Sequence, residues 1–191
     1  IGKVESYELK RNVLLPKFDI PKEFETEDDY LKYLTYEGAK KRYPALTADI
    51  KDRIDFELET IKKTGYPGYF LIVQDFTSKA REMGVSVGPG RGSAAGSAVA
   101  FCIGITNVDP IAYDLLFERF LNPDRVSLPD IDIDFDDEGR DKVLDYVIQK
   151  YGHNQVAQII TYGTMAAKSS IKDCARVMEL PLADANMLAT L

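Results

Sequence analysis

The stretch at residues 129–135 constrains this chain more than any other part of it. Its sequence, PDIDIDF, alternates aspartates with large apolar residues. A period of two is typical of a β-strand, because successive side chains of a strand point to opposite faces. Asp130, Asp132 and Asp134 are therefore predicted to share one face, while the apolar face packs on a core.

Three carboxylates on one face repel one another, and burial adds to the cost unless a cation compensates. Hard oxygen ligands at this spacing suit Mg²⁺ or Mn²⁺. A solvated acidic surface is the simpler alternative, but it gives no reason for the alternating isoleucines. A calcium loop of the EF-hand kind needs glycine at its sixth position, where this chain has Phe135. The stretch therefore indicates a magnesium or manganese site.

The net charge of −7 is concentrated around this stretch. Residues 124–145 hold nine acidic and three basic side chains, whereas the rest of the chain holds 22 acidic and 21 basic ones. The excess of acidic residues at 124–145 therefore indicates a functional site and is not a general property of the chain. The sequence has no strong basic patch, so the chain alone is expected to bind DNA weakly.

The remaining composition narrows the class of protein. With 191 residues and 45% hydrophobic content, the chain suits one globular domain. No apolar run approaches the ~20 residues that span a membrane. Cys102 and Cys174 lack nearby partners and are interpreted as reduced core residues of a cytoplasmic protein. The single histidine, His153, nearly excludes a zinc site or a Ser-His-Asp triad. Because the chain starts without Met and stops in an apolar run, we expect a piece of a longer protein.

Helical and strand-like patterns are interleaved along the chain, which predicts an α/β (α+β) fold. The expected helices span about residues 26–42, 47–65, 70–83, 93–103, 109–122, 138–151 and 164–178. The expected strands lie near residues 13–15, 85–87, 129–135 and 155–161.

A glycine-rich loop, GPGRGSAAGS at residues 88–97, follows one expected strand and opens a helix. Glycines let backbone N–H groups approach an anion, and a helix N-terminus adds partial positive charge, so the loop favours phosphate binding. It is not a dinucleotide fingerprint, because Asp109 downstream precedes a proline and does not end an apolar strand. The lack of lysine excludes a P-loop. A tight turn that only serves helix packing is the alternative.

The loop and the acidic stretch together predict more than either does alone. A phosphate-binding loop followed by metal-binding carboxylates is what nucleotidyl transfer requires, since two metals activate the attacking hydroxyl and stabilise the leaving pyrophosphate. Arg91 and Arg125 are candidates to neutralise a triphosphate.

Five segments resemble the bacterial DNA polymerase III alpha subunits, the C family of DNA polymerases. The segments are GYPGYFLIV at 65–73, the glycine loop at 88–97, DLLFERFLNP at 114–123, PDIDIDF at 129–135 and ITYGTMAAK at 160–168. They occur in the family's order, and the resemblance covers nearly all of the chain.

The resemblance implies a fold and a division into domains. It implies a polymerase β-like nucleotidyltransferase palm, with a small mixed sheet and flanking helices. Residues 1–24 would connect from a preceding PHP domain, residues 25–163 would form the N-terminal part of the palm, and residues 164–191 would start a helical thumb.

The resemblance also implies roles for single residues. Asp132 and Asp134 correspond to catalytic carboxylates that hold two Mg²⁺ ions, for which Mn²⁺ can substitute, and Asp130 shares their face as a further metal ligand. Lys168 is implied to contact DNA. Beside Arg91, the residues implied to bind the nucleotide are Gly92, Ser93, Gly96, Ser97 and Arg125.

The implied activity is DNA-directed DNA polymerisation, in which a primer 3′-hydroxyl attacks the α-phosphate of a dNTP. The implied partners are primer-template DNA, dNTPs, other replicase subunits and the sliding clamp. The family's third catalytic aspartate lies beyond this chain, so the chain by itself is expected to be inactive. A template-independent nucleotidyltransferase and a metal-stabilised domain that merely binds nucleotides are the alternatives.

Overall fold

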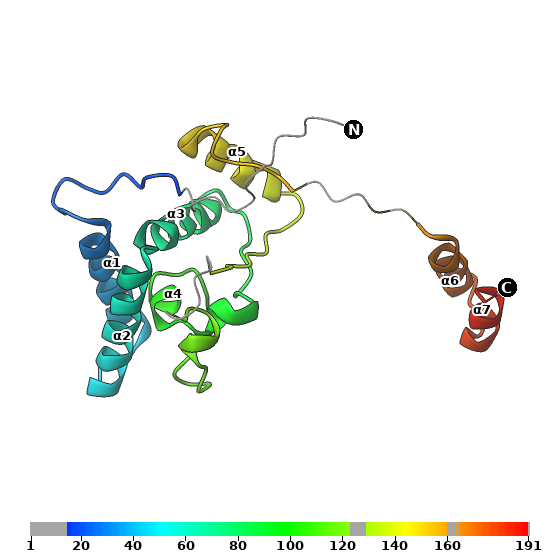
Figure 1. Cartoon of the computed structure of the whole chain (residues 1–191), viewed down its shortest axis with the longest axis horizontal. Helices are drawn as coiled ribbons and strands as arrows, with labels where there is room; N and C mark the ends of the chain where they lie inside the picture. The colour runs from blue at the N-terminus through cyan, green and yellow to red at the C-terminus, as the bar shows by residue number, and fades with distance from the viewer. Residues whose placement is uncertain (1–14, 123–128, 160–162, 164, 191) are drawn as a thin grey trace, which may run out of the picture. The chain divides into compact units, whose positions relative to one another are not determined.

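The computed structural model describes residues 15–122, 129–159, 163 and 165–190 (Figure 1). The chain divides into two compact units, residues 1–156 and 157–191. The helices of the first unit are α1 (Glu27–Arg42), α2 (Ala48–Thr64), α3 (Pro67–Glu82), the 3₁₀ turn η1 (Gly92–Gly96), α4 (Ala98–Cys102), the 3₁₀ turn η2 (Phe117–Arg119) and α5 (Arg140–Tyr151). The second unit contains α6 (Ala167–Val177) and α7 (Leu182–Leu188), which pack against each other.

The first two helices begin and end at the residues that the sequence predicts. Thr26 and Thr47 cap α1 and α2, and their hydroxyls accept hydrogen bonds from the backbone N–H groups of Asp29 and Ile50. Gly65 ends α2 with a left-handed φ of 77°, a conformation that suits glycine. Helix α3 begins at Pro67, earlier than the expected residue 70, because proline fits the first turn of a helix.

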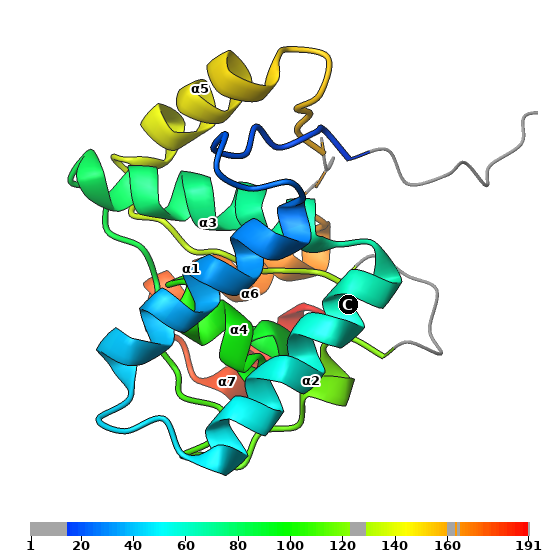
Figure 2. The same cartoon turned by 90° about the vertical axis from the view of Figure 1, so that its left-hand side faces the viewer.

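The main core lies where α1, α3 and α4 meet, and Figure 2 shows α1 lying across both other helices. Leu31, Phe70 and Val99 are fully buried there or nearly so. Phe117 and Leu121 from the segment around η2 complete the core. This segment and η1, which contact each other, are thereby held against the helices.

The predicted α/β (α+β) fold with a small mixed sheet is wrong for the residues that the structure describes. Their only strand-like pairing is an isolated antiparallel bridge between Val87 and Phe135, flanked by backbone hydrogen bonds between Gly88 and Asp134 and between Asp136 and Ser86. A two-stranded ribbon needs a third strand or a packed helix for stability, and no third extended segment of the described chain pairs with it. The described part of the fold is helical.

Two other expected elements differ from the structure. The helix expected at 93–103 is split, because Ser97 has an extended backbone between η1 and α4. The helix expected at 109–122 is replaced by turns and η2, since Asp114 has a left-handed φ of 50°. Residues 155–159 form no strand, and the remainder of that expected strand lies outside the described residues, as do residues 13–14.

Helix α5 follows the acidic stretch and is fixed to α3 by one carboxylate. Asp75 of α3 accepts hydrogen bonds from the Tyr146 and Tyr151 hydroxyls, each at 2.9 Å, and pairs with Lys150 at 2.6 Å.

None of the helices within the described ranges is long and apolar enough to cross a membrane.

We expect Gly38→Ala to destabilise the first unit. A Cβ atom at Gly38 would lie 1.9 Å from the Cys102 carbonyl oxygen, so α1 and α4 would have to separate. Such overpacking costs about 1–3 kcal/mol of the free energy of unfolding. Thermal and urea unfolding measure the effect, and Gly163→Ala is the control because a Cβ there meets nothing within 4 Å. Equal stability of the two variants would contradict this packing.

Candidate active site

Two of the three predicted carboxylates face the same cation. Arg91 Nη2 lies 3.2 Å from Asp132 Oδ1, and Arg91 Nε lies 3.3 Å from Asp134 Oδ2. The Asp132 and Asp134 side chains are 36% and 61% exposed, so both are open to solvent and to a ligand. Although the stretch is not part of a sheet, its extended backbone places these two carboxylates on one side, as the alternation predicts.

The apolar residues of the stretch hold it on the protein. Ile131 and Ile133 pack against the main core, and Phe135 packs against Phe76 of α3 with ring centroids 6.4 Å apart. The Gly88 N–H group donates a 2.8 Å hydrogen bond to the Asp134 carbonyl oxygen. The carboxylates are thus fixed from behind by burial and from one side by the glycine loop.

The glycine loop approaches the carboxylates closely. Gly92 has a left-handed φ of 67°, and a Cβ there would lie 3.2 Å from Asp132 Oδ2. Ser93 is exposed, so its hydroxyl is free to reach a ligand. The loop therefore presents backbone and hydroxyl groups beside a pair of acids, an arrangement that suits a metal-bound phosphate.

An open pocket of about 380 Å³ adjoins the loop. Its volume is within the range of about 300–1,000 Å³ that is typical of small-molecule sites. Arg119 contributes a cationic side chain that has no ion-pair partner among the described residues. The remaining wall is formed by loop and apolar residues, namely Gly92, Ser93, Ala95, Gly96, Leu115 and Leu116.

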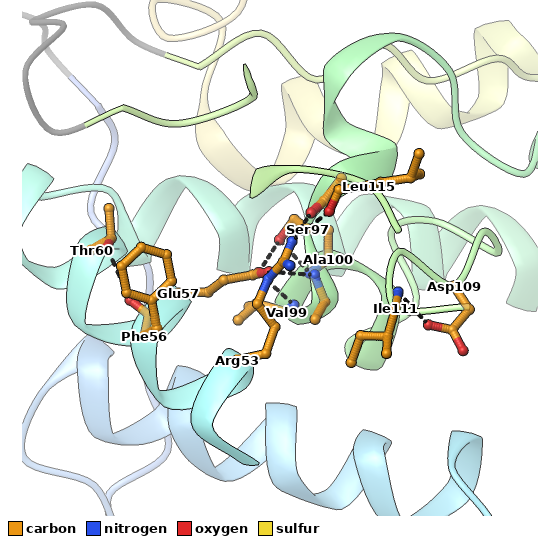
Figure 3. A network of polar contacts seen from close by, with 12 residues as sticks. Arg53, Phe56, Glu57, Thr60, Ser97, Val99, Ala100, Asp109, Ile111 and Leu115 are labelled. Carbon is orange, nitrogen blue, oxygen red and sulfur yellow. Dashed lines mark hydrogen bonds and ion pairs between the residues drawn. The ribbon is translucent and has the colours of Figure 1, made fainter. Parts of the chain in front are cut away.

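An ion pair within α2 contacts residues that line the pocket (Figure 3). Glu57 of α2 is completely buried, and its carboxylate accepts hydrogen bonds from the Ala98 and Val99 N–H groups at 2.9 and 3.0 Å and from the Ser97 hydroxyl at 2.8 Å. Arg53 pairs with it at 2.7 Å. Burial raises the pKa of Glu57, while these four hydrogen bonds oppose the shift and favour the carboxylate.

The other predicted residues have different locations. Ser97 is buried with its hydroxyl bound to Glu57, and Gly96 is buried too. Asp130 is exposed. Lys168 lies near the start of α6 in the second unit and is exposed. Arg125 lies outside the described residues.

Three residues near the site were not predicted. Glu57 had a signal, because it follows Ile54 by three positions and precedes Ile61 by four, so a charged residue sits on an apolar helix face. Tyr69 of α3 lies near the acidic stretch, where burial chiefly raises its pKa and the charges of the stretch add to the shift. Arg119 gave no signal beyond its charge.

The capacity for metal binding rests on Asp132 and Asp134. Within the part of the chain that the structure describes, no three His, Cys, Asp or Glu residues are gathered as a metal site. Mg²⁺ commonly takes one or two protein carboxylates and completes its octahedron with substrate phosphates and water. Two neighbouring carboxylates that already face one cation fit that kind of site.

Comparison with known proteins gives one consistent family. A family model described as the bacterial DNA polymerase III alpha NTPase domain matches residues 29–191. The chain is 54% identical over 175 residues to the DNA polymerase III subunit alpha of Borreliella burgdorferi, which covers 92% of this chain and 15% of that protein. It is 53% identical over 193 residues to the corresponding subunit of Aquifex aeolicus, covering 98% of this chain and 16% of the relative. The chain thus spans about a sixth of the length of these curated relatives.

Proposed function

Because this chain belongs to the family of bacterial DNA polymerase III alpha subunits, we propose that it supplies part of the active site of a DNA-directed DNA polymerase. The observation that carries the proposal is the placement of Asp132 and Asp134 beside the glycine loop. Carboxylates, loop and pocket together offer what nucleotidyl transfer needs: metal ligands next to a place for phosphates. The rest of the polymerase would come from the longer subunit.

The proposed reaction joins a dNTP to a primer. The 3′-hydroxyl of the primer attacks the α-phosphate, the bond to the β-phosphate breaks, and pyrophosphate leaves. Asp132 and Asp134 would hold the two Mg²⁺ ions, for which Mn²⁺ can substitute, and Asp130 is a further candidate ligand. Bound metal would lower the pKa of the hydroxyl and neutralise charge on the leaving group.

The residues of the loop would bind and orient the triphosphate. Backbone N–H groups at Gly92 and the Ser93 hydroxyl are available for phosphate oxygens, and Gly96 and Ser97 would support them from the buried side. Arg91 and Arg119 would add positive charge at the pocket. Arg125, which lies outside the described residues, remains a candidate from the sequence and the family resemblance.

The proposed partners follow from the family. Primer-template DNA and dNTPs would be substrates, and other replicase subunits and the sliding clamp would be partners of the longer protein. Lys168 is the candidate DNA contact in this chain. Bacterial chromosomes are replicated in the cytoplasm, and that is the location we propose.

Replacing either carboxylate tests the proposal. In the longer subunit that contains this chain, Asp132→Asn or Asp134→Asn should abolish primer extension, because each removes a metal ligand and its charge. The chain of 191 residues alone should extend no primer, since positioning of template and dNTP needs the remaining domains. Asp137→Asn is the control, because this neighbouring acid is also exposed. Full extension by the Asp132 and Asp134 variants would contradict the assignment.

Replacing Gly92 tests the loop. Gly92→Val in the longer subunit should raise KM for dNTP at least tenfold, because the side chain blocks approach to the backbone and meets Asp132. Affinity for primer-template should change little. Gly84→Val is a matched control: Gly84 has a similar φ of 76°, so the backbone strain is shared, but a Cβ there meets nothing within 4 Å. If both variants lose stability and neither alters KM, the loop serves only packing.

Arg91 provides a test on the chain alone. Its guanidinium occupies the side of both carboxylates that faces the loop, so Arg91 and a metal compete for the same oxygens. Arg91→Gln should therefore tighten Mn²⁺ binding in the absence of nucleotide. The gain should be about two- to thirtyfold, because Arg91 makes two exposed ion pairs and each contributes about 0.2–1 kcal/mol.

Titration with Mn²⁺, followed by calorimetry or electron paramagnetic resonance, measures that change. Arg119→Gln is the control for net charge, and Asp132→Asn/Asp134→Asn should remove the binding in either background. Weaker Mn²⁺ binding by Arg91→Gln than by the unmodified chain would show that Arg91 does not oppose the metal.

A further inference from the structure

The Glu57–Arg53 pair is unusual in where its hydrogen bonds go. Besides binding Glu57, Arg53 Nη2 donates to the carbonyl oxygens of Gly96 at 2.8 Å and Leu115 at 2.9 Å. Glu57 binds the backbone of Ala98 and Val99 on the other side of Ser97. One pair on α2 therefore holds two segments that are far from it in sequence, as Figure 3 shows.

The same two segments form walls of the pocket. Gly96 lies at the end of η1, and Leu115 precedes η2; both line the pocket, as do their neighbours Ala95 and Leu116. They also touch directly, since a Cβ at Gly96 would lie 2.7 Å from the Leu116 carbonyl oxygen. The spacing of the two walls is therefore set by this direct contact together with Arg53, which binds one carbonyl group of each wall.

A gain in folding stability does not by itself explain why the Glu57–Arg53 ion pair is present. Burying the Glu57 charge, with Arg53 only 25% exposed beside it, costs desolvation energy that well-packed apolar residues of similar volume avoid, so such pairs often give no net gain in stability. What a fully hydrogen-bonded pair provides is directional geometry, because every bond fixes the position of a particular backbone group. Here the groups that are fixed belong to the pocket.

We propose that Glu57 and Arg53 are positioning residues for nucleotide binding: they hold η1 and the segment before η2 at the spacing that admits the nucleotide. This inference rests on the proposed function. The pair touches no reacting atom, so it acts through the backbone of the loop. Its loss should therefore weaken nucleotide binding without removing the catalytic carboxylates or the DNA contacts.

Glu57→Gln is the primary variant, tested in the longer subunit. All four of the groups around Glu57 donate hydrogen bonds, so the amide NH₂ of glutamine leaves at least one backbone N–H unpaired. We expect KM for dNTP to rise about tenfold or more, because small misplacements of a binding site are costly. The dissociation constant for primer-template should stay within about twofold.

The matched control is Glu59→Gln on the same helix, an exposed residue whose contact is a 3.4 Å ion pair with Lys63. It should leave KM and kcat unchanged. Circular dichroism and size-exclusion chromatography establish the folded fraction, to which the kinetic constants are referred. An unchanged KM for Glu57→Gln, with only a lower Tm, would overturn the proposal.

Arg53→Lys decides the question if Glu57→Gln does not accumulate as folded protein. Arg53 binds Glu57 through Nε and both carbonyl groups through Nη2. Lysine keeps the positive charge but has a single nitrogen in place of these two, so KM for dNTP should again rise while affinity for primer-template is kept. A normal KM would overturn the proposal.

Asp132→Asn in parallel separates this inference from the proposed function. Loss of extension by Asp132→Asn with a normal KM in the Glu57 and Arg53 variants refutes the positioning role alone. Full extension by Asp132→Asn refutes the proposed function, and the positioning role with it.

Discussion

The buried carboxylate of Glu57 is the interaction on which the arrangement of the site depends. A charge inside a core is tolerated only when donors surround it, and here the donors come from Arg53, from Ser97 and from the backbone that starts α4. Meeting that requirement brings the end of the glycine loop onto α2. Arg53 also donates a hydrogen bond to the Leu115 carbonyl group. Compensating the charge of Glu57 therefore holds both walls of the pocket in place.

The acidic stretch is held beside the glycine loop by a different set of interactions. Its isoleucines are drawn to the main core, while a single bridge at Val87 and Phe135 aligns it with the start of the glycine loop. The carboxylates then project on the open side, where Arg91 balances their charge. Apolar burial therefore positions the acids, and the buried ion pair positions the loop. The site forms where these two sets of contacts meet.

The sequence predicted the features of this fold that depend on interactions between residues close together in the chain. The caps at Thr26 and Thr47 and the left-handed Gly65 bounded two helices correctly, and alternation placed Asp132 and Asp134 on one side. The α/β class and the mixed sheet that the family resemblance implied were wrong for the described residues. Period-two alternation indicates an extended chain with one buried face, but it does not identify strand partners. At the split, the Ser97 hydroxyl binds Glu57, which lies 40 residues away in sequence. The carbonyl group of Leu115, next to the left-handed Asp114, accepts a hydrogen bond from Arg53, 62 residues away. Such long-range polar contacts are only weakly indicated by the sequence. Here the one indication is Glu57, a charged residue on an apolar helix face.

The central claim is that the carboxylates and the glycine loop form one nucleotide site. The most direct measurement is a crystal structure of the longer subunit with primer-template, a non-hydrolysable dNTP analogue and Mn²⁺, with anomalous scattering recorded for manganese. Our account predicts manganese peaks beside Asp132 and Asp134, phosphates along Gly92 and Ser93, and Arg91 moved off the carboxylates. Manganese and triphosphate bound elsewhere, with Arg91 still paired to both aspartates, would contradict it.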